Sequence, residues 1–249
     1  MLEDVMMVYN EKNNSQLEYC TIWECRLRRL FKEELYDDAL TSAKNLIKFC
    51  EKQGYLLKKV EYELFIAKIH NKSDAAHEAL FQTLKIIEKA EEWQMSILIL
   101  DAKILLSEIH LEMSSYYEAL TLLNEIEAGI LGKCNPEIKA NFYIIRAKTV
   151  LYLSSEIKRN EPGAVAMKKS AIVDLEICIT YCDKISLYQQ MREALFLKSI
   201  ICHSLAELYK RRNKGEQYKE FSKQKESLAR EFNNIDQHIE KTINSVCLK

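Results

Sequence analysis

Turn-forming residues are scarce in this chain, which has five Gly and two Pro among its 249 residues. A β-rich domain of this length needs a turn about every 8–12 residues, and too little turn chemistry is present to supply them. The same scarcity excludes collagen-like and low-complexity chains, and a hydrophobic content of 48% excludes a disordered one. The composition therefore predicts an all-α protein.

The chain also lacks an excess of charge of one sign and a long apolar run. The chain has 36 basic and 37 acidic side chains and a net charge of −1, so electrostatics gives no argument for a nucleic-acid or membrane-surface partner. The apolar run Ile97–Leu100 is stopped by Asp101, far short of the roughly 18–20 residues of a membrane span. We therefore expect a protein that binds neither nucleic acid nor membranes.

We expect the eight cysteines to belong to a chain without a secretory signal. The segment Met1–Asp4 is acidic where a secretory signal is basic. Cysteines in that setting indicate reduced thiols rather than a disulfide framework. We therefore expect a nuclear and/or cytoplasmic protein.

The most informative feature that is present is an Ala-Leu pair that recurs at a constant spacing. The pair begins at Ala39, at Ala79 and at Ala119, so these three alanines are equally spaced along the sequence. Each pair opens an amphipathic helix; in the first, Ala39, Ala43 and Leu46 share one face. A small residue near the start of a helix lets the preceding helix approach closely. This Ala-Leu period therefore predicts helix–turn–helix repeats.

Capping residues indicate where several of these helices begin and end. Gly54 stands where a left-handed residue commonly ends a helix, and Ser115-x-x-Glu118 has the pattern of a capping box. Asn135-Pro136 supplies an N-cap and a Pro at the first helical position. Residues 154–169 are interpreted as an insertion in the turn before a helix that Ala171 opens.

The predicted fold is an all-α, tetratricopeptide-like helical-repeat solenoid of about five helix pairs plus a terminal helix. Setting Ala39 at the conserved Ala of that repeat places Trp23 at its first large aromatic position. It also places Ala67 and Ser107 at the small-residue position of the first helix, where the first repeat departs with Leu27. We expect one superhelical domain over residues 1–249, with helix pairs at roughly 15–53, 55–92, 93–132, 136–184 and 187–232 and a capping helix at 234–247.

Protein binding is the usual work of a solenoid, and in this repeat the first helix of each pair supplies the inner face. The alignment predicts that this protein-binding face includes Glu24, Arg28, Glu61, Lys68, Asp101 and Glu108. Its charge is mixed. A chaperone-tail clamp uses Lys and Asn to hold a terminal carboxylate, which Glu24 would repel, so this alignment disfavours such a clamp.

Two cysteines raise the question of a metal. Cys178 and Cys182 are four residues apart on one predicted helix, and Cys202 or His203 could join them. The spacing is not that of a zinc knuckle, and both thiols continue an apolar stripe. We favour buried structural thiols over a metal site.

No catalytic motif is recognisable in the sequence. A Gly-rich phosphate loop, a nucleophile elbow and a His-Glu metalloprotease motif are all missing. The five His are scattered, and the carboxylate pairs lie on predicted helix surfaces. We therefore expect a protein that is not an enzyme and has no cofactor, no metal and no small-molecule substrate.

The densest basic run is Lys210–Lys214. It is open to two interpretations. The first is a nuclear import signal or a contact for an acidic partner. The second, which is the commoner case, is the cationic end of a helix that reaches solvent.

Several segments from residue 120 onward resemble the C-terminal region of the anaphase-promoting complex subunit 5 family. The resemblance lies in packing patterns rather than in catalytic signatures, and it closely covers a little under half of the chain. The segments are Leu123–Glu127, Lys139–Lys148, Glu161–Gly163, Ala171–Lys184, Phe196–Lys198, Leu205–Tyr209, Asn213–Glu216 and Tyr218–Phe221.

This resemblance implies the tetratricopeptide part of a longer scaffold subunit in the platform of a mitotic ubiquitin ligase. Family members carry a further N-terminal helical domain, so the resemblance implies that the chain is a C-terminal fragment. The family has no active site, because the cullin and RING subunits carry the ligase chemistry. The implied partners are platform subunits 1 and 4. The apolar segment Val5–Tyr9 suggests contact with missing chain or with a neighbour.

Two functions remain in competition at this point. The first is a non-enzymatic scaffold subunit of a cullin-RING-type ubiquitin ligase. The second is a tetratricopeptide adaptor that binds peptide segments of cargo or chaperone partners. A basic, Asn-lined groove would favour the adaptor, whereas the predicted face is mixed in charge.

Overall fold

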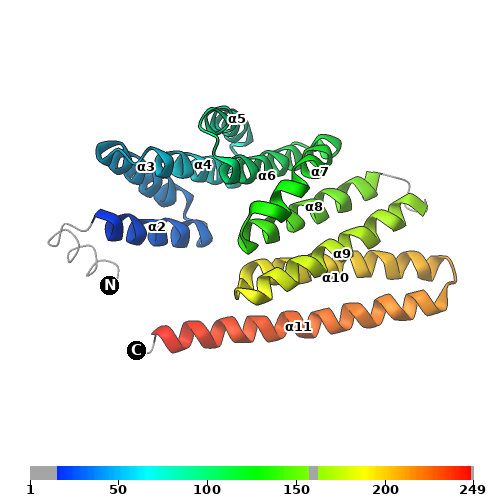
Figure 1. Ribbon diagram of the computed structural model, residues 1–249. Coiled ribbons are helices and arrows are strands. Elements are labelled where there is room, and N and C mark those ends of the chain that lie inside the picture. Colours follow the sequence, from blue (N-terminus) through cyan, green and yellow to red (C-terminus); the bar gives the residue numbers. More distant parts are fainter. Residues whose placement is uncertain (1–15, 157–161, 248–249) are drawn as a thin grey trace. The chain divides into compact units, whose positions relative to one another are not determined.

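The computed structural model describes residues 16–156 and 162–247, and within these ranges it is all-helical. The predicted fold class is confirmed: helices follow one another in consecutive packed pairs, the architecture of a helical repeat (Figure 1). The segment Val5–Tyr9 lies outside the described residues. The helices are α2 (Gln16–Lys32), α3 (Tyr36–Gln53), α4 (Leu56–Lys72), α5 (Ala76–Glu92), α6 (Ser96–Glu112), α7 (Tyr116–Lys133), α8 (Pro136–Glu156), α9 (Pro162–Lys184), α10 (Tyr188–Arg211) and α11 (Gly215–Cys247).

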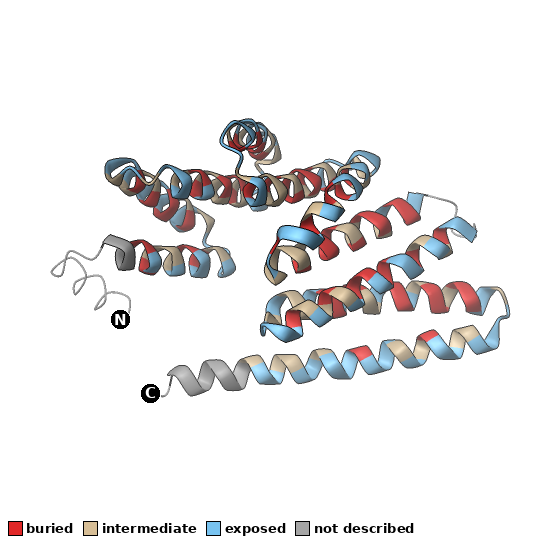
Figure 2. Cartoon of the chain, in the orientation of Figure 1, coloured by how far each residue is buried: buried red, intermediate tan, exposed pale blue. Residues whose placement is uncertain are grey.

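The chain divides into two compact units, Met1–Met113 and Ser114–Lys249. Helices α2–α6 belong to the first unit and α7–α11 to the second. Within each unit a helix packs against the helices that precede and follow it in the sequence. Each unit therefore buries one face of every inner helix between its neighbours, which Figure 2 shows as buried stripes.

The repeat alanines lie where the Ala-Leu period predicts. Ala39, Ala79 and Ala119 are fully buried near the starts of α3, α5 and α7. The aligned first-helix residues Ala67 and Ser107 are also fully buried. The Ser107 hydroxyl donates a hydrogen bond to the Lys103 carbonyl oxygen at 2.9 Å, which satisfies a polar group that would otherwise be costly to bury. The Ala-Leu period is therefore a packing period.

Trp23 contributes to the core of the first unit as a partly buried side chain. It packs against a buried cluster that includes Leu27, Leu46 and Tyr62. The Arg26 guanidinium lies 5.2 Å from the centre of the Trp23 ring. Trp23 therefore lies at the edge of the core, and the Arg26 guanidinium covers one face of its ring.

The turns that follow α2, α3, α4, α5 and α6 recur twice in each Ala-Leu period, once after every helix. A residue with positive φ ends each turn: Glu34, Gly54, Asp74, Gln94 and Ser114. Around these residues the amide of Leu35 donates to the Leu30 carbonyl at 3.0 Å, and the amide of Tyr55 donates to the Cys50 carbonyl at 2.8 Å. This is the six-to-one bond of the Schellman motif. One backbone turn therefore joins successive helices, whatever side chain stands at its left-handed position.

The backbone turn also explains why one predicted cap is wrong. Ser115 is the N-cap residue of α7, but its side chain makes no capping hydrogen bond, so the capping box with Glu118 does not form. Leu35 and Tyr55 occupy the same position in earlier turns with similar dihedral angles. The prediction for Asn135 is confirmed, because its Oδ1 accepts a hydrogen bond from the Ile138 amide at 2.9 Å.

Gly54→Ala is expected to lower the free energy of unfolding by about 1–2 kcal/mol. Gly54 has φ +75 and a Cβ added there would meet nothing within 4 Å, so the cost is that of a left-handed backbone alone. Gln94→Gly, at the equivalent turn, is the matched control and is expected to be stabilising or neutral. Urea denaturation followed by Trp fluorescence measures both; a loss of stability in both variants would contradict the shared turn.

Two helices differ from their predicted bounds. The expected insertion at 154–169 is largely helical: α8 continues to Glu156, and α9 begins at Pro162 rather than near Ala171. Pro162 is suited to a first helical position because its fixed φ is helical and it needs no hydrogen-bond acceptor there. The extra residues therefore lengthen the two helices rather than the turn.

The expected break before a separate capping helix at 234–247 does not occur. Helix α11 runs unbroken from Gly215 to Cys247, and no Gly or Pro interrupts it after Gly215. Phe221 and Leu228 are buried on the side that packs on α10, while Lys219 and Lys223 are exposed. A polar outer face is what the terminal helix of a repeat array requires.

Candidate functional site

The six residues predicted to bind protein lie on three helices of the first unit. Glu24 and Arg28 are on α2, Glu61 and Lys68 are on α4, and Asp101 and Glu108 are on α6. We call the surface that they share with Lys58, Tyr62 and Lys72 the first-helix face. All three helices are the first members of their predicted pairs.

On this face, Glu24 links α2 to α4. Its carboxylate lies 3.1 Å from the Arg28 guanidinium on its own helix. It also accepts a hydrogen bond from the Tyr62 hydroxyl at 3.2 Å and lies 3.8 Å from Lys58 Nζ. Lys58 in turn pairs with Glu61 at 2.7 Å. The N-terminal half of the face is therefore one connected network of charges.

A second set of pairs links α4 to α6. Lys68 Nζ lies 2.7 Å from Asp101 Oδ2, and Lys72 Nζ lies 2.6 Å from Glu108 Oε1. The buried Asn71 amide donates to Glu112 Oε1 at 3.2 Å. Each of the six predicted residues is thus in an ion pair with a neighbour on the same face.

The sequence alignment missed Lys58, Tyr62 and Lys72. They lie on one stripe of α4 with Glu61 and Lys68, since helix neighbours are three or four residues apart. Following that stripe along α4 would have found them. What no single-helix pattern shows is which carboxylate on α2 or α6 each of them meets.

The pairing leaves the first-helix face with its charges matched rather than in excess. Exposed ion pairs contribute at most about 1 kcal/mol each, so their main effect is to fix the spacing of neighbouring first helices. Glu24 is already held by Arg28 and Tyr62. The geometry favours a rigid surface of fixed pattern over a cationic clamp for a free carboxylate.

Beneath this face, burial perturbs two groups of the first unit. Burial raises the pKa of the Cys50 thiol to about 11, with the nearby Cys20 adding to the effect. Burial also raises the pKa of Tyr62 above its ordinary value, and the negative charge of Glu24 adds to it. Both groups are therefore held in their neutral forms by the fold.

Stability of the first unit is expected to fall as the pH rises from 9 towards 11. Because the pKa of Cys50 moves from 9.0 in a model thiol to about 11 in the fold, the unfolded chain releases this proton first, and deprotonation favours unfolding. The full contribution is present below pH 9. Both Trp residues, Trp23 and Trp93, lie in the first unit, so urea titrations followed by Trp fluorescence measure the effect.

The control for this pH dependence is Cys50→Ala, which removes the thiol and should make the decline between pH 9 and 11 shallower. A wild-type free energy of unfolding that stays constant or rises across that interval would contradict the assignment.

Cys178 and Cys182 are fully buried on α9, with their sulfur atoms 3.8 Å apart. The Cys178 thiol donates to the Ala140 carbonyl oxygen at 3.5 Å, and its contact with Cys182, together with burial, raises its pKa. Cys202 contacts Gln224 instead, and His203 is exposed. In the part of the chain that the structure describes, no group of three or more His, Cys, Asp or Glu side chains could hold a metal ion.

The second unit contains a partly buried ion network that the sequence analysis did not identify. Arg146 on α8 donates from Nε and Nη2 to the two Asp174 oxygens on α9, at 2.9 and 2.6 Å. Its Nη1 donates to Glu127 on α7 at 2.6 Å. Burial raises the pKa of Asp174, and the Arg146 charge opposes that shift. The network joins three successive helices through one guanidinium.

The basic run Lys210–Lys214 spans the end of α10 and the turn after it. Lys210 and Arg211 form the last turn of α10, and Asn213 has a positive φ. This position matches the interpretation of a cationic helix end reaching solvent.

No protein-family model matches this chain, and no curated protein matches it. Among residues 16–156 and 162–247, no helix has both the length and the apolar character needed to cross a membrane.

Proposed function

We propose that this chain is a non-enzymatic scaffold subunit of a multisubunit cullin-RING-type ubiquitin ligase, the anaphase-promoting complex. Its role would be to hold neighbouring platform subunits, notably subunits 1 and 4, in a fixed relation to one another during mitotic progression. It would act there as a nuclear and/or cytoplasmic component without a cofactor or substrate of its own.

The observation that carries this proposal is the resemblance over residues 120–230, whose segments supply much of the core of the second unit. Leu123 on α7, Phe142 on α8 and Leu205 on α10 belong to those segments and are fully buried. A resemblance of buried residues in the same order supports a shared architecture, and a scaffold works through its architecture.

The first-helix face gives a second line of support. Its cations and carboxylates are matched by pairs such as Lys68–Asp101 at 2.7 Å. A surface whose charges are already paired suits a permanent neighbour with a complementary pattern better than a succession of short charged peptides. This favours the scaffold over the transient adaptor.

Co-expression with platform subunits 1 and 4 tests the proposal. Size-exclusion chromatography of the purified mixture should give one peak that contains the three proteins in equal amounts. Elution of this chain apart from both subunits would contradict the proposal.

A charge swap tests whether the first-helix face takes part. Lys68→Asp combined with Asp101→Lys keeps the internal pair and reverses the pattern that a neighbour would meet, so it should weaken co-elution without lowering the Tm. The matched control is Glu176→Lys with Lys198→Glu, which swaps the 2.9 Å pair between α9 and α10. Equal co-elution of both swaps would exclude the first-helix face as the contact.

A further inference from the structure

The outward face of α3 carries three lysines at a spacing of about one helical turn. Lys44, Lys48 and Lys52 are four residues apart along the helix, and all three are exposed. Ala43 and Leu46 are buried on the opposite side of the same helix. We call the surface formed by the three lysines the α3 lysine stripe. Because α3 is the second helix of its pair, this stripe is separate from the first-helix face.

No carboxylate in the described part of the chain neutralises the α3 lysine stripe. Among residues 16–156 and 162–247, none of its three ammonium groups takes part in an ion pair. Glu51 is the one acidic residue within a helical turn of a stripe lysine, three residues after Lys48, and its carboxylate pairs with Lys59 on α4 at 2.7 Å. Like charges four residues apart on a helix repel one another. The stripe is therefore open to a carboxylate from outside the chain.

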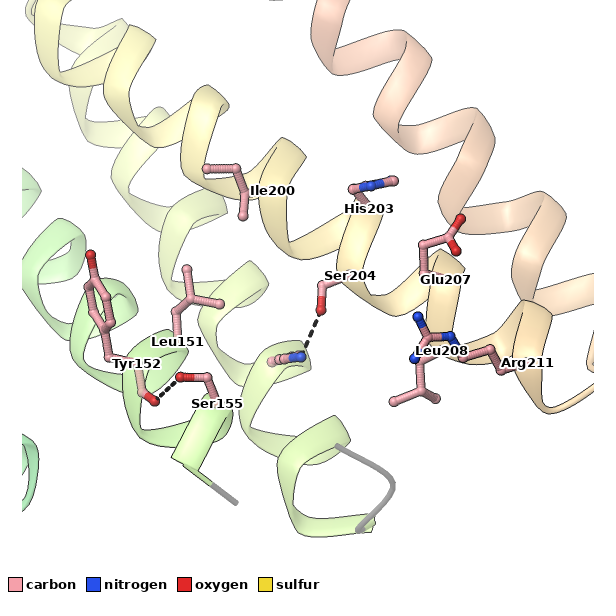
Figure 3. Close-up of a pocket in the computed structure, with 10 residues that line it drawn as sticks. Leu151, Tyr152, Ser155, Ile200, His203, Ser204, Glu207, Leu208 and Arg211 are labelled. Carbon is pink, nitrogen blue, oxygen red and sulfur yellow. Dashed lines mark hydrogen bonds between the residues drawn. The ribbon is translucent and has the colours of Figure 1, made fainter. Parts of the chain in front are cut away.

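The buried lysine of the second unit shows the contrasting case. A cavity of about 440 Å³ lies between α8, α9 and α10, and Lys168 is among its lining residues (Figure 3). Lys168 is buried, and its Nζ donates to the Ser204 hydroxyl oxygen at 2.7 Å, the bond that the dashed line to Ser204 marks. A cation that is bonded within the fold needs no external anion, whereas the stripe lysines are exposed and unpaired within the described residues.

The α3 lysine stripe is not a requirement of the helical repeat. One Ala-Leu period later, the equivalent positions of α5 hold Leu84, Glu88 and Glu92. Two periods later, in α7, the first two of these positions hold Asn124 and Ala128. Packing of the repeat therefore does not explain why three lysines stand here.

Two exposed leucines follow the stripe along the chain. Helix α3 ends at Gln53, and after the turn at Gly54 the helix α4 opens with Leu56 and Leu57. These leucines are 54% and 58% exposed. Leu56 is four residues after Lys52, which limits the distance between their Cα atoms to about 14 Å. Neighbouring exposed apolar side chains with charged residues around them are typical of interaction surfaces.

We propose that the α3 lysine stripe, together with Leu56 and Leu57, binds an acidic segment of a partner protein. Carboxylates of the segment meet Lys44, Lys48 and Lys52, and a large apolar side chain next to them lies on the two leucines. The site goes beyond the scaffold role, because it lies outside the first-helix face and does not depend on which complex contains the chain.

The chemistry of the surface favours an acidic peptide over other polyanions. Lysines attract an anionic membrane by about 1 kcal/mol each, and the net charge of −1 for the whole chain adds no further attraction. Proteins that bind single-stranded nucleic acids use aromatic side chains as stacking platforms, whereas the stripe is followed by aliphatic leucines. A peptide supplies carboxylates and an apolar side chain within one short segment.

Fluorescence polarisation with the purified chain tests this site directly. The probe is a fluorescein-labelled peptide with Glu-Asp-Glu-Glu-Leu-Phe between Gly-Ser flanks. One matched peptide carries Gln-Asn-Gln-Gln-Leu-Phe, which removes the charge, and another carries Glu-Asp-Glu-Glu-Ala-Ala, which removes the large side chains. The probe should bind, and each matched peptide should bind at least about tenfold more weakly. Added NaCl should weaken binding of the probe, because salt screens exposed charges.

Charge reversal at the stripe locates the binding. Lys44→Glu combined with Lys48→Glu should weaken binding of the probe by about tenfold or more. The matched control is Lys219→Glu combined with Lys223→Glu on α11, where two exposed lysines also stand four residues apart. This control changes the net charge equally and should bind the probe like the wild type. Circular dichroism melts confirm that both variants fold.

A second variant tests the two leucines. Leu56→Gln combined with Leu57→Gln should lower the affinity for the probe to about that of the Ala-Ala peptide for the wild type. The affinity of this variant for the Ala-Ala peptide should equal that of the wild type, because the carboxylates still meet the lysines.

The proposal would be overturned if the probe did not bind, or if the acidic and amide peptides bound equally. Equal binding of the probe to the stripe variant and to its α11 control would also overturn it. Tighter binding of a labelled single-stranded oligonucleotide, or of vesicles of phosphatidylcholine and phosphatidylserine, would replace the peptide by another polyanion. Because the assay uses the purified chain without ligase subunits, its outcome is independent of the co-elution experiment.

Discussion

Asp174→Ala is expected to lower the free energy of unfolding by about 3–5 kcal/mol, because it leaves a largely buried guanidinium, 13% exposed, without its main partner. The Asp174 side chain is 6% exposed, and it accepts two hydrogen bonds from Arg146, at 2.6 and 2.9 Å. Glu127 remains as a partner for one nitrogen of Arg146, but the other donors lose theirs. Urea denaturation followed by circular dichroism measures the loss.

The matched control is Glu176→Ala, two residues further along α9. Glu176 pairs with Lys198 at 2.9 Å but is largely exposed, so its loss should cost no more than about 1 kcal/mol. Similar costs for the two variants would contradict the buried network.

A double variant separates the destabilisation that an unpaired Arg146 causes from the stabilisation that the Arg146–Asp174 ion pair provides. Desolvation raises the pKa of Asp174, whereas the pKa of Arg146 rises despite its own desolvation, because Asp174 and Glu127 accept its hydrogen bonds. Removing both Arg146 and Asp174 removes the desolvation cost together with the attraction. Arg146→Met combined with Asp174→Leu should therefore recover most of the stability that Asp174→Ala loses. A double variant less stable than Asp174→Ala alone would show that the ion pair itself stabilises the fold.

Phe142→Ala is expected to lower the free energy of unfolding by about 3–5 kcal/mol, as a large-to-small change in a packed core. Phe142 is fully buried on α8, and its ring packs edge-on against Tyr143 at 5.2 Å between ring centres. The Arg146 guanidinium lies 4.9 Å from the Phe142 ring centre. The variant removes both contacts and leaves a cavity beside the buried ion network.

Phe196→Ala is the matched control, because it makes the same chemical change at an exposed position of α10. Its stability should stay within about 0.5 kcal/mol of the wild type. If the two variants have equal effects in the same denaturation experiment, the packing of α8 in the second unit is wrong.

The architecture was predictable because packing leaves a direct trace in the sequence. Ala39, Ala79 and Ala119 are small since helices approach closely there, and all three are fully buried. Among the turns, only Gly54 left such a trace. Glu34, Gly54 and Asp74 share a left-handed backbone but no side-chain chemistry, so the shorter period of the turns was invisible in the sequence.

The candidate face was predictable in part for a similar reason. Helical spacing placed Lys68 and Asp101 on first helices, but their 2.7 Å pairing depends on how α4 and α6 meet. The Arg146 network was missed because its partners, Glu127 and Asp174, lie on two other helices. One signal was available: Arg146 is a lone charge within the otherwise apolar stretch Phe142–Ala147.

Affinity purification from dividing cells would show whether this chain is a resident scaffold of a ubiquitin ligase, as we propose. The tagged chain is purified at moderate salt, and the co-purifying proteins are identified and quantified by mass spectrometry. If the chain is such a scaffold, the co-purifying proteins form a stoichiometric set that includes a cullin-like subunit and a RING subunit. Recovery of chaperones, motors or one small partner in their place would contradict the scaffold role and favour the adaptor.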